Sequence, residues 1–170
     1  MRSRLSSCAD LRRDASPIAP TRGMTLIEML VTVLIVAVAA SMATAAYGAY
    51  RTRSQESSAA NDIVAIQTAV QKYFVERSVL PATLADVGPG IAAMMDPWGH
   101  GYQYVNHANA AANGLFREDG NIVPINSDFD LYSMGEDGAS AAPLTDAASR
   151  DDIVRANNGR FVGRASVYGP

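Results

Sequence analysis

The segment from residue 137 to residue 152 holds several side chains that could together bind a metal ion. They offer hard oxygen ligands, and calcium takes about six to eight such ligands in flexible loops. A solvated surface loop has the same composition, so residue chemistry alone leaves both interpretations open. The oxygen-bearing side chains are Asp137, Ser140, Asp146, Asp151 and Asp152.

Patterns typical of catalysis are weak in this sequence. His100 and His107 are seven residues apart, without a cysteine or a spaced set of carboxylates beside them, so a zinc site is not indicated. The serines lack a nucleophile elbow or a paired base, and no glycine-rich phosphate loop joins a strand to a helix. We therefore expect a protein that is not an enzyme.

Glu28 is the other chemically unusual residue, because it is the only ionisable side chain from Met24 to Tyr50. An apolar run of about 20 residues is long enough to cross a membrane as a helix. A carboxylate within such a span costs on the order of 3 kcal/mol unless it is paired. Glu28 therefore predicts a specific partner, and a chain cut after Gly23 would supply one as the α-ammonium group of Met24.

The charged residues around this span predict its orientation and exclude one class of partner. Five arginines precede the span and two follow it closely, and basic flanks stay in the cytoplasm, so the rest of the chain should lie outside. Without residues 1–23 the chain keeps nine Lys and Arg residues against 15 Asp and Glu residues, a poor basis for nucleic-acid binding. The arginines are Arg2, Arg4, Arg12, Arg13 and Arg22 before the span, and Arg51 and Arg53 after it.

The residues from Arg22 to Glu28, RGMTLIE, resemble the class III leader of type IV pilins and type II secretion pseudopilins. The resemblance implies that a prepilin peptidase cuts after Gly23 and methylates the new amino terminus at Met24. It also implies that Glu28 pairs with the amino terminus of a neighbouring subunit during assembly. Met24 stands where phenylalanine is usual, and Ala45 stands where a proline is usual, so a helix break at Ala45 cannot be assumed.

Beyond residue 51 the helix is expected to continue as an amphipathic one, because Ile63, Ile66, Val70 and Phe74 recur at steps of three and four. It should end shortly before Pro81. Strands are expected around Tyr102 and Tyr104, which share one face, and over residues 128–134 and 159–163. These elements predict an α+β, pilin-like fold, in which a long N-terminal α-helix packs on a small antiparallel β-sheet. The predicted parts are a cleaved leader (1–23), a transmembrane and filament-core helix (24–50), and a periplasmic globular domain (51–170).

Two blocks in the globular part resemble the major pseudopilin of type II secretion. They are DPWG-x-x-YQY at residues 96–104 and DLYS-x-G-x-DG at residues 130–138. In that family a structural calcium ion ties the following loop together. The resemblance implies as ligands the carbonyl of Met134, the carboxylate of Asp137, and a further aspartate, Asp151 or Asp152, with Asp146 outside the set. The spacer 106–127 and the loop after Asp137 are longer than the family pattern.

The resemblance implies a structural subunit of a pseudopilus that drives type II secretion by polymerisation. Its partners would be copies of itself, the prepilin peptidase, minor pseudopilins and the inner-membrane assembly platform, with a single bacterial inner-membrane span and a periplasmic domain. A type IV pilin or minor pilin for adhesion, motility or DNA uptake is the alternative, although the one cysteine, Cys8, lies in the leader and pilins generally carry a C-terminal disulfide. An uncleaved, membrane-anchored periplasmic binding domain is a further alternative.

Overall fold

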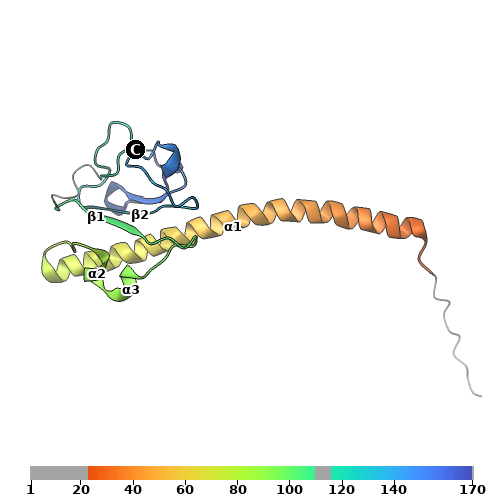
Figure 1. Ribbon diagram of the computed structural model, residues 1–170, viewed down its shortest axis with the longest axis horizontal. Helices are drawn as coiled ribbons and strands as arrows, with labels where there is room; N and C mark the ends of the chain where they lie inside the picture. Colours follow the sequence, from red (N-terminus) through yellow and green to blue (C-terminus); the bar gives the residue numbers. More distant parts are fainter. Residues whose placement is uncertain (1–22, 110–115, 170) are drawn as a thin grey trace, which may run out of the picture. The chain divides into compact units, whose positions relative to one another are not determined.

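The computed structural model describes residues 23–109 and 116–169 (Figure 1). Contacts divide the chain into two compact units, residues 1–43 and residues 44–170. Helix α1 (Leu26–Arg77) contributes residues to both units. The predicted leader, including Cys8, lies outside the described residues except for Gly23.

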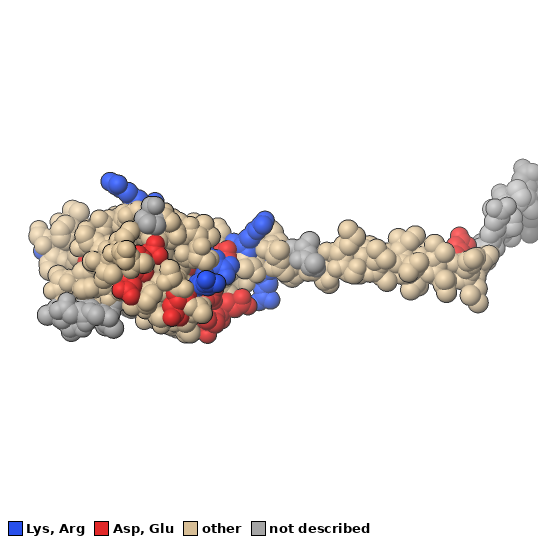
Figure 2. All heavy atoms as spheres, turned by 90° about the horizontal axis from the view of Figure 1, so that it is seen from above, with Lys and Arg blue, Asp and Glu red and all other residues tan. Residues whose placement is uncertain are grey.

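The first unit contains the apolar part of α1, whose large side chains are exposed. Every Leu, Ile, Val and Met from Leu26 to Val38 is at least 45% exposed, and Figure 2 shows this segment with one acidic residue near its start. The hydroxyl of Thr32 donates to the carbonyl of Met29, so this polar group is satisfied within the helix. By length and composition α1 can cross a membrane, and its apolar surface needs lipid or other protein around it. The helix continues through Ala45 without interruption.

The second unit combines the remainder of α1 with a small antiparallel sheet. Among the described residues, four strands pair in the order β1-β2-β3-β4, each antiparallel to its neighbour. A long helix packed on a small antiparallel sheet confirms the predicted α+β fold. The strands are β1 (Gln103–Asn106), β2 (Phe129–Ser133), β3 (Ile153–Ala156) and β4 (Phe161–Arg164); the helices are α2 (Leu84–Val87) and α3 (Pro89–Ala92), and the 3-10 turns are η2 (Ala147–Ser149), η3 (Asn157–Gly159) and η4 (Ala165–Val167).

The main core lies between α1 and the sheet. Ile63, Ile66 and Val70 are fully buried on the helix, as their spacing predicts. Tyr102 and Tyr104 both pack against this cluster, so they share the face that the sequence indicated. Burying a side chain of this size contributes roughly 2 kcal/mol, which fastens the helix to the sheet. The other buried members of the cluster are Ala59, Phe129, Leu131 and Ile153.

Phe74 was expected to extend this apolar stripe, and that part of the prediction is wrong. Its side chain is 48% exposed. Near the end of α1 a different face has neighbours, because Ala69 and Tyr73 line a depression together with Val87 and Ile91. The segment containing α2 and α3, rather than the sheet, therefore covers the last turns of the helix and leaves Phe74 uncovered.

Strand β3 is an interior strand that the sequence did not predict, whereas β1, β2 and β4 lie close to their predicted positions. All four β3 residues are buried, including Arg155. Ile153 belongs to the cluster on α1, while Val154 and Ala156 belong to a second cluster with Ile125, Leu144 and Ala165. A four-residue run that contains an arginine is too short and too polar for a period-two pattern to reveal.

Candidate functional site

The predicted processing site lies directly before α1. Gly23 and Met24 have no regular secondary structure and are exposed, with 58% of Met24 accessible. An exposed peptide bond outside a helix is the kind of bond that a protease can reach. Cleavage after Gly23 and methylation of Met24 stay predictions.

Glu28 has a local partner that the sequence interpretation missed. The amide of Thr25 donates to Glu28 Oε2 at 3.4 Å, and the amide of Glu28 donates to Thr25 Oγ1 at 3.3 Å. This reciprocal pair is a capping box, and the pattern Thr-x-x-Glu is its sequence signature. Glu28 therefore has two candidate roles, as the cap of α1 and as the charge that pairs with a neighbouring amino terminus.

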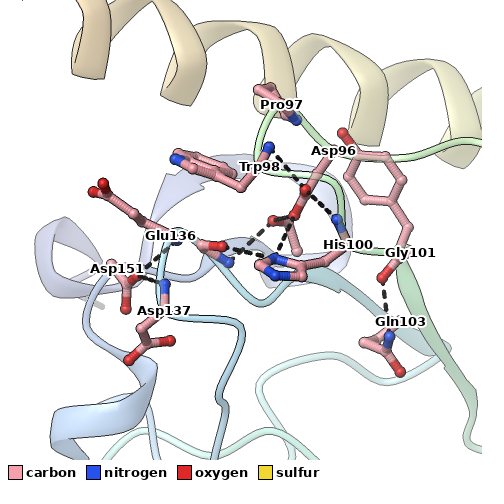
Figure 3. Close-up of polar contacts among 12 residues, drawn as sticks. Asp96, Pro97, Trp98, His100, Gly101, Gln103, Glu136, Asp137 and Asp151 are labelled. Atoms are coloured by element: carbon pink, nitrogen blue, oxygen red, sulfur yellow. Dashed lines mark hydrogen bonds and ion pairs between the residues drawn. The ribbon is translucent and has the colours of Figure 1, made fainter.

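In the globular unit, one buried carboxylate joins the Asp-Pro-Trp-Gly turn to the end of β2 (Figure 3). Asp96 is 5% exposed, and its Oδ1 accepts from the amides of Trp98 at 3.0 Å and His100 at 2.8 Å. The hydroxyl of Ser133 donates to Asp96 Oδ2 at 2.5 Å and accepts from the amide of Gly135 at 3.1 Å. The two sequence blocks thus meet at a single side chain.

Replacing Asp96 by alanine should destabilise the globular unit by about 2 kcal/mol, because it leaves two partly buried amides and a buried hydroxyl without their acceptor. Urea unfolding of the full chain in detergent, followed by tryptophan fluorescence of Trp98, measures this difference. Glu136→Ala is the matched control in the loop that packs against this turn, because Glu136 is exposed and only its amide makes a hydrogen bond in this network. A midpoint for Asp96→Ala that equals the control would show that the carboxylate does not hold the turn.

Two glycines of the second block allow the loop after β2 to close on its neighbours. Gly135 and Gly138 have φ angles of 65° and 68°, which favour glycine. A Cβ at Gly135 would lie 2.5 Å from Asp151 Oδ2, and one at Gly138 would lie 2.8 Å from His100 Nε2. His100 Nδ1 also lies 3.1 Å from the carbonyl oxygen of Gly135. The glycines therefore provide both the turn and the close approach.

Asp137 and Asp151, two of the predicted calcium ligands, come together at this turn (Figure 3). Asp151 Oδ2 accepts from the amides of Glu136 at 2.8 Å and Asp137 at 3.2 Å. Asp137 Oδ1 accepts from the amide of Ala139 at 2.8 Å. These carboxylates hold the turn through hydrogen bonds to the main chain. Asp146, which the resemblance placed outside the ligand set, caps η2 instead.

Asp152 has different partners. It is fully buried, and its Oδ2 accepts from Arg117 Nη2 at 2.5 Å and from Ser140 Oγ at 2.5 Å. Burial raises the pKa of Asp152 to about 6, although Ser140 and Arg117 act in the opposite direction. At neutral pH the carboxyl group is therefore mainly ionised, and Arg117 supplies its counter-charge.

Of the four residues predicted to bind calcium, the structure brings Asp137 and Asp151 to one turn and gives Asp152 a different partner. Asp152 is bonded to Arg117, Asp137 and Asp151 accept from main-chain amides, and Met134 directly follows β2. In residues 23–109 and 116–169, no group of three or more His, Cys, Asp or Glu side chains could hold a metal ion. The two histidines contact separate groups, His100 at Gly135 and His107 at Asp130. Calcium binding stays a prediction.

Known proteins resemble this chain both in its N-terminal segment and over most of its length. Residues 19–44 match the family model of the prokaryotic N-terminal methylation motif. The chain is 25% identical over 147 residues to the type II secretion system core protein G of Vibrio cholerae, a match that covers 74% of this chain and 87% of that protein. It is 27% identical over 152 residues to the core protein G of Escherichia coli, covering 78% and 89%. The chain is a type IV pilin-like protein.

A fimbrial protein also resembles this pilin-like protein. The fimbrial protein EcpC of Eikenella corrodens is 36% identical over 93 residues, and the match covers 55% of this chain and 56% of that protein. The chain thus spans little more than half the length of this relative. No solved structure matches the chain significantly.

Two buried arginines of the pilin-like protein were missed by the sequence interpretation. Arg117 bonds to Asp152, and Arg155 bonds to Asp128. Arg155 also donates to Gln67 Oε1 of α1 at 2.7 Å, so it joins the sheet to the helix. Their sequence neighbourhoods carry no motif, and the only signal is weak: an arginine within an otherwise apolar stretch, IVRA, at β3.

Proposed function

We propose that this pilin-like protein is a structural subunit of a periplasmic pseudopilus, whose polymerisation drives type II protein secretion. The observation that carries the proposal is the similarity to two core proteins G over 87% and 89% of their lengths. The methylation motif alone would support only a filament subunit of unspecified system. The role is mechanical and not enzymatic.

In this proposal, α1 exchanges lipid for copies of itself. A prepilin peptidase removes the leader and methylates Met24 while the apolar part of α1 lies in the inner membrane. The exposed side chains from Leu26 to Val38 then pack against the same helix of other subunits, so apolar surface stays covered throughout. Glu28 pairs with the new amino terminus of a neighbour, and the globular unit lies in the periplasm. Minor pseudopilins and the inner-membrane assembly platform are the other partners.

A type IV pilin or minor pilin is the second candidate, and the similarity to a fimbrial protein favours it. That match has the higher identity, 36%, but it extends over 93 residues and covers only 55% of this chain. The longer matches to core proteins G therefore favour secretion.

Deletion of the gene in its host, with the wild-type chain and an empty vector as complementation controls, separates the two functions. If the protein is a secretion subunit, the amount of exported enzymes in the medium should fall at least tenfold in the deletion strain. The enzymes should accumulate in the periplasm, while surface pili and twitching motility stay normal. Loss of pili or motility with normal secretion would contradict the proposal and support the pilin. Restoration by the wild-type chain shows that either phenotype belongs to this protein.

A further inference from the structure

Arg117 is the cation that the structure places inside the loop between β2 and β3. Its side chain is 2% exposed, and its guanidinium bonds to the loop at Ser140 and Ala141 and again at Asp152, directly before β3. Nη1 donates to Ser140 Oγ at 2.6 Å and to the carbonyl of Ala141, while Nη2 donates to Asp152 Oδ2 at 2.5 Å. The amide of Arg117 donates to Asp130 Oδ2 of β2 at 2.8 Å, which fixes the arginine to the sheet.

The carboxylate of Asp152 requires such a cation. Asp152 is fully buried, and an ionised carboxylate without a partner in the interior costs several kcal/mol. Two buried side-chain atoms in this part of the structure lack a hydrogen-bond partner, Arg117 Nε and Asp152 Oδ1. The ion pair between the two residues therefore rests on the single bond from Arg117 Nη2 to Asp152 Oδ2, and Ser140 and Ala141 provide the other polar contacts of the guanidinium and the carboxylate.

A divalent cation at the same carboxylate would conflict with this arrangement. It would lie close to a guanidinium that is bonded to the same oxygen, and like charges a few ångströms apart repel strongly where water is excluded. The guanidinium also lies over the ring of Tyr132, 4.3 Å from its centroid, which stabilises a cation at this position. The other two predicted carboxylate ligands, Asp137 and Asp151, accept hydrogen bonds from main-chain amides of the loop.

We propose that the guanidinium of Arg117 closes the loop between β2 and β3 in place of a calcium ion. The loop then needs no metal to fold, because its counter-charge is part of the chain. This role concerns the folding of the globular unit and holds whichever filament system the protein serves.

Thermal unfolding of the full-length protein in detergent, with 1 mM EGTA or with 1 mM CaCl2, tests this proposal. The wild-type protein should unfold at the same temperature in both solutions. Arg117→Met should lower the unfolding temperature by about 10 °C, because it leaves Asp152 buried without a counter-charge. Arg150→Met is the matched control, since Arg150 lies exposed in the same loop and only its carbonyl accepts a hydrogen bond. It should unfold like the wild type.

A double variant keeps the test valid if Arg117→Met does not fold. Arg117→Met with Asp152→Leu removes both charges, so it should recover most of the lost stability in EGTA. If calcium binds Asp152, the double variant should instead unfold at a lower temperature than Arg117→Met in CaCl2, because the double variant would lack a ligand. An increase in the unfolding temperature of the wild-type protein when calcium replaces EGTA would overturn the proposal, and so would a double variant no more stable than Arg117→Met.

Discussion

Replacing Glu28 by glutamine should abolish filament assembly while leaving the globular unit folded. Glutamine keeps the acceptor oxygen that the capping box uses but removes the negative charge. The amino terminus of a neighbouring subunit would then lie among apolar helices without a counter-charge. This unpaired charge costs about 3 kcal/mol for each subunit, so the association constant for adding a subunit to the filament falls by about a hundredfold. The measurement is the fraction of the protein in filaments sheared from cells that overproduce it.

Thr25→Ala is the control that separates the two roles of Glu28. It removes the hydroxyl of the capping box and retains the charge, so it should cost about 1 kcal/mol of helix stability and still assemble. Circular dichroism and proteolysis should show a normal globular unit in both variants. Normal filaments from Glu28→Gln, together with impaired filaments from Thr25→Ala, would assign Glu28 to the cap and remove the pairing argument.

Replacing Arg155 by alanine should reduce the free energy of unfolding by about 3 kcal/mol. Arg155 is 1% exposed and donates to both carboxylate oxygens of Asp128, at 2.8 and 2.7 Å, and to the carbonyl of Phe129. Its guanidinium also lies 3.9 Å from the centroid of the Phe129 ring. The expected loss is at the lower end for a buried pair, because 34% of the Asp128 side chain is exposed and water replaces part of the lost interaction. Urea unfolding at pH 7 measures it.

The pH dependence of this loss identifies its electrostatic part. Burial alone would raise the pKa of Asp128, but the hydrogen bonds from Arg155 and from the Phe129 amide lower it below its usual value. A lowered carboxyl pKa stabilises the fold above the unfolded value of about 4, and this stability disappears as the pH falls through the folded value. The difference between wild type and Arg155→Ala should therefore be largest at pH 7 and narrow below about pH 4. Arg160→Ala, at an exposed arginine, should show no difference at either pH.

The periodic parts of the sequence predicted their structure well, because local pattern decides them. The spacing of Ile63, Ile66 and Val70 identified the buried face of α1, and the alternation over 128–134 identified β2. Phe74 continued the pattern but is exposed, because the segment containing α2 and α3 packs on a different face of the last turns of α1. That packing is a tertiary effect, which the local pattern does not reveal. Strand β3 was missed because its four residues include an arginine.

The site residues divide in the same way. The roles of Gly23, Met24 and Glu28 were predicted from contiguous sequence and stay predictions, and the same stretch also carries the Thr-x-x-Glu signature of the capping box. The pairing of Arg117 with Asp152 was not, because 35 residues separate them and each has other carboxylates or arginines nearer in sequence. A single sequence gives no means of choosing among such long-range partners.

The intact mass of the protein purified from membranes, with and without a co-expressed prepilin peptidase, tests most directly that this is a processed filament subunit. The account predicts that the peptidase converts the full-length chain into one that begins at Met24 and carries one added methyl group. A full-length, unmodified chain in the presence of an active peptidase would contradict the account, since Glu28 would then have no processed amino terminus to pair with.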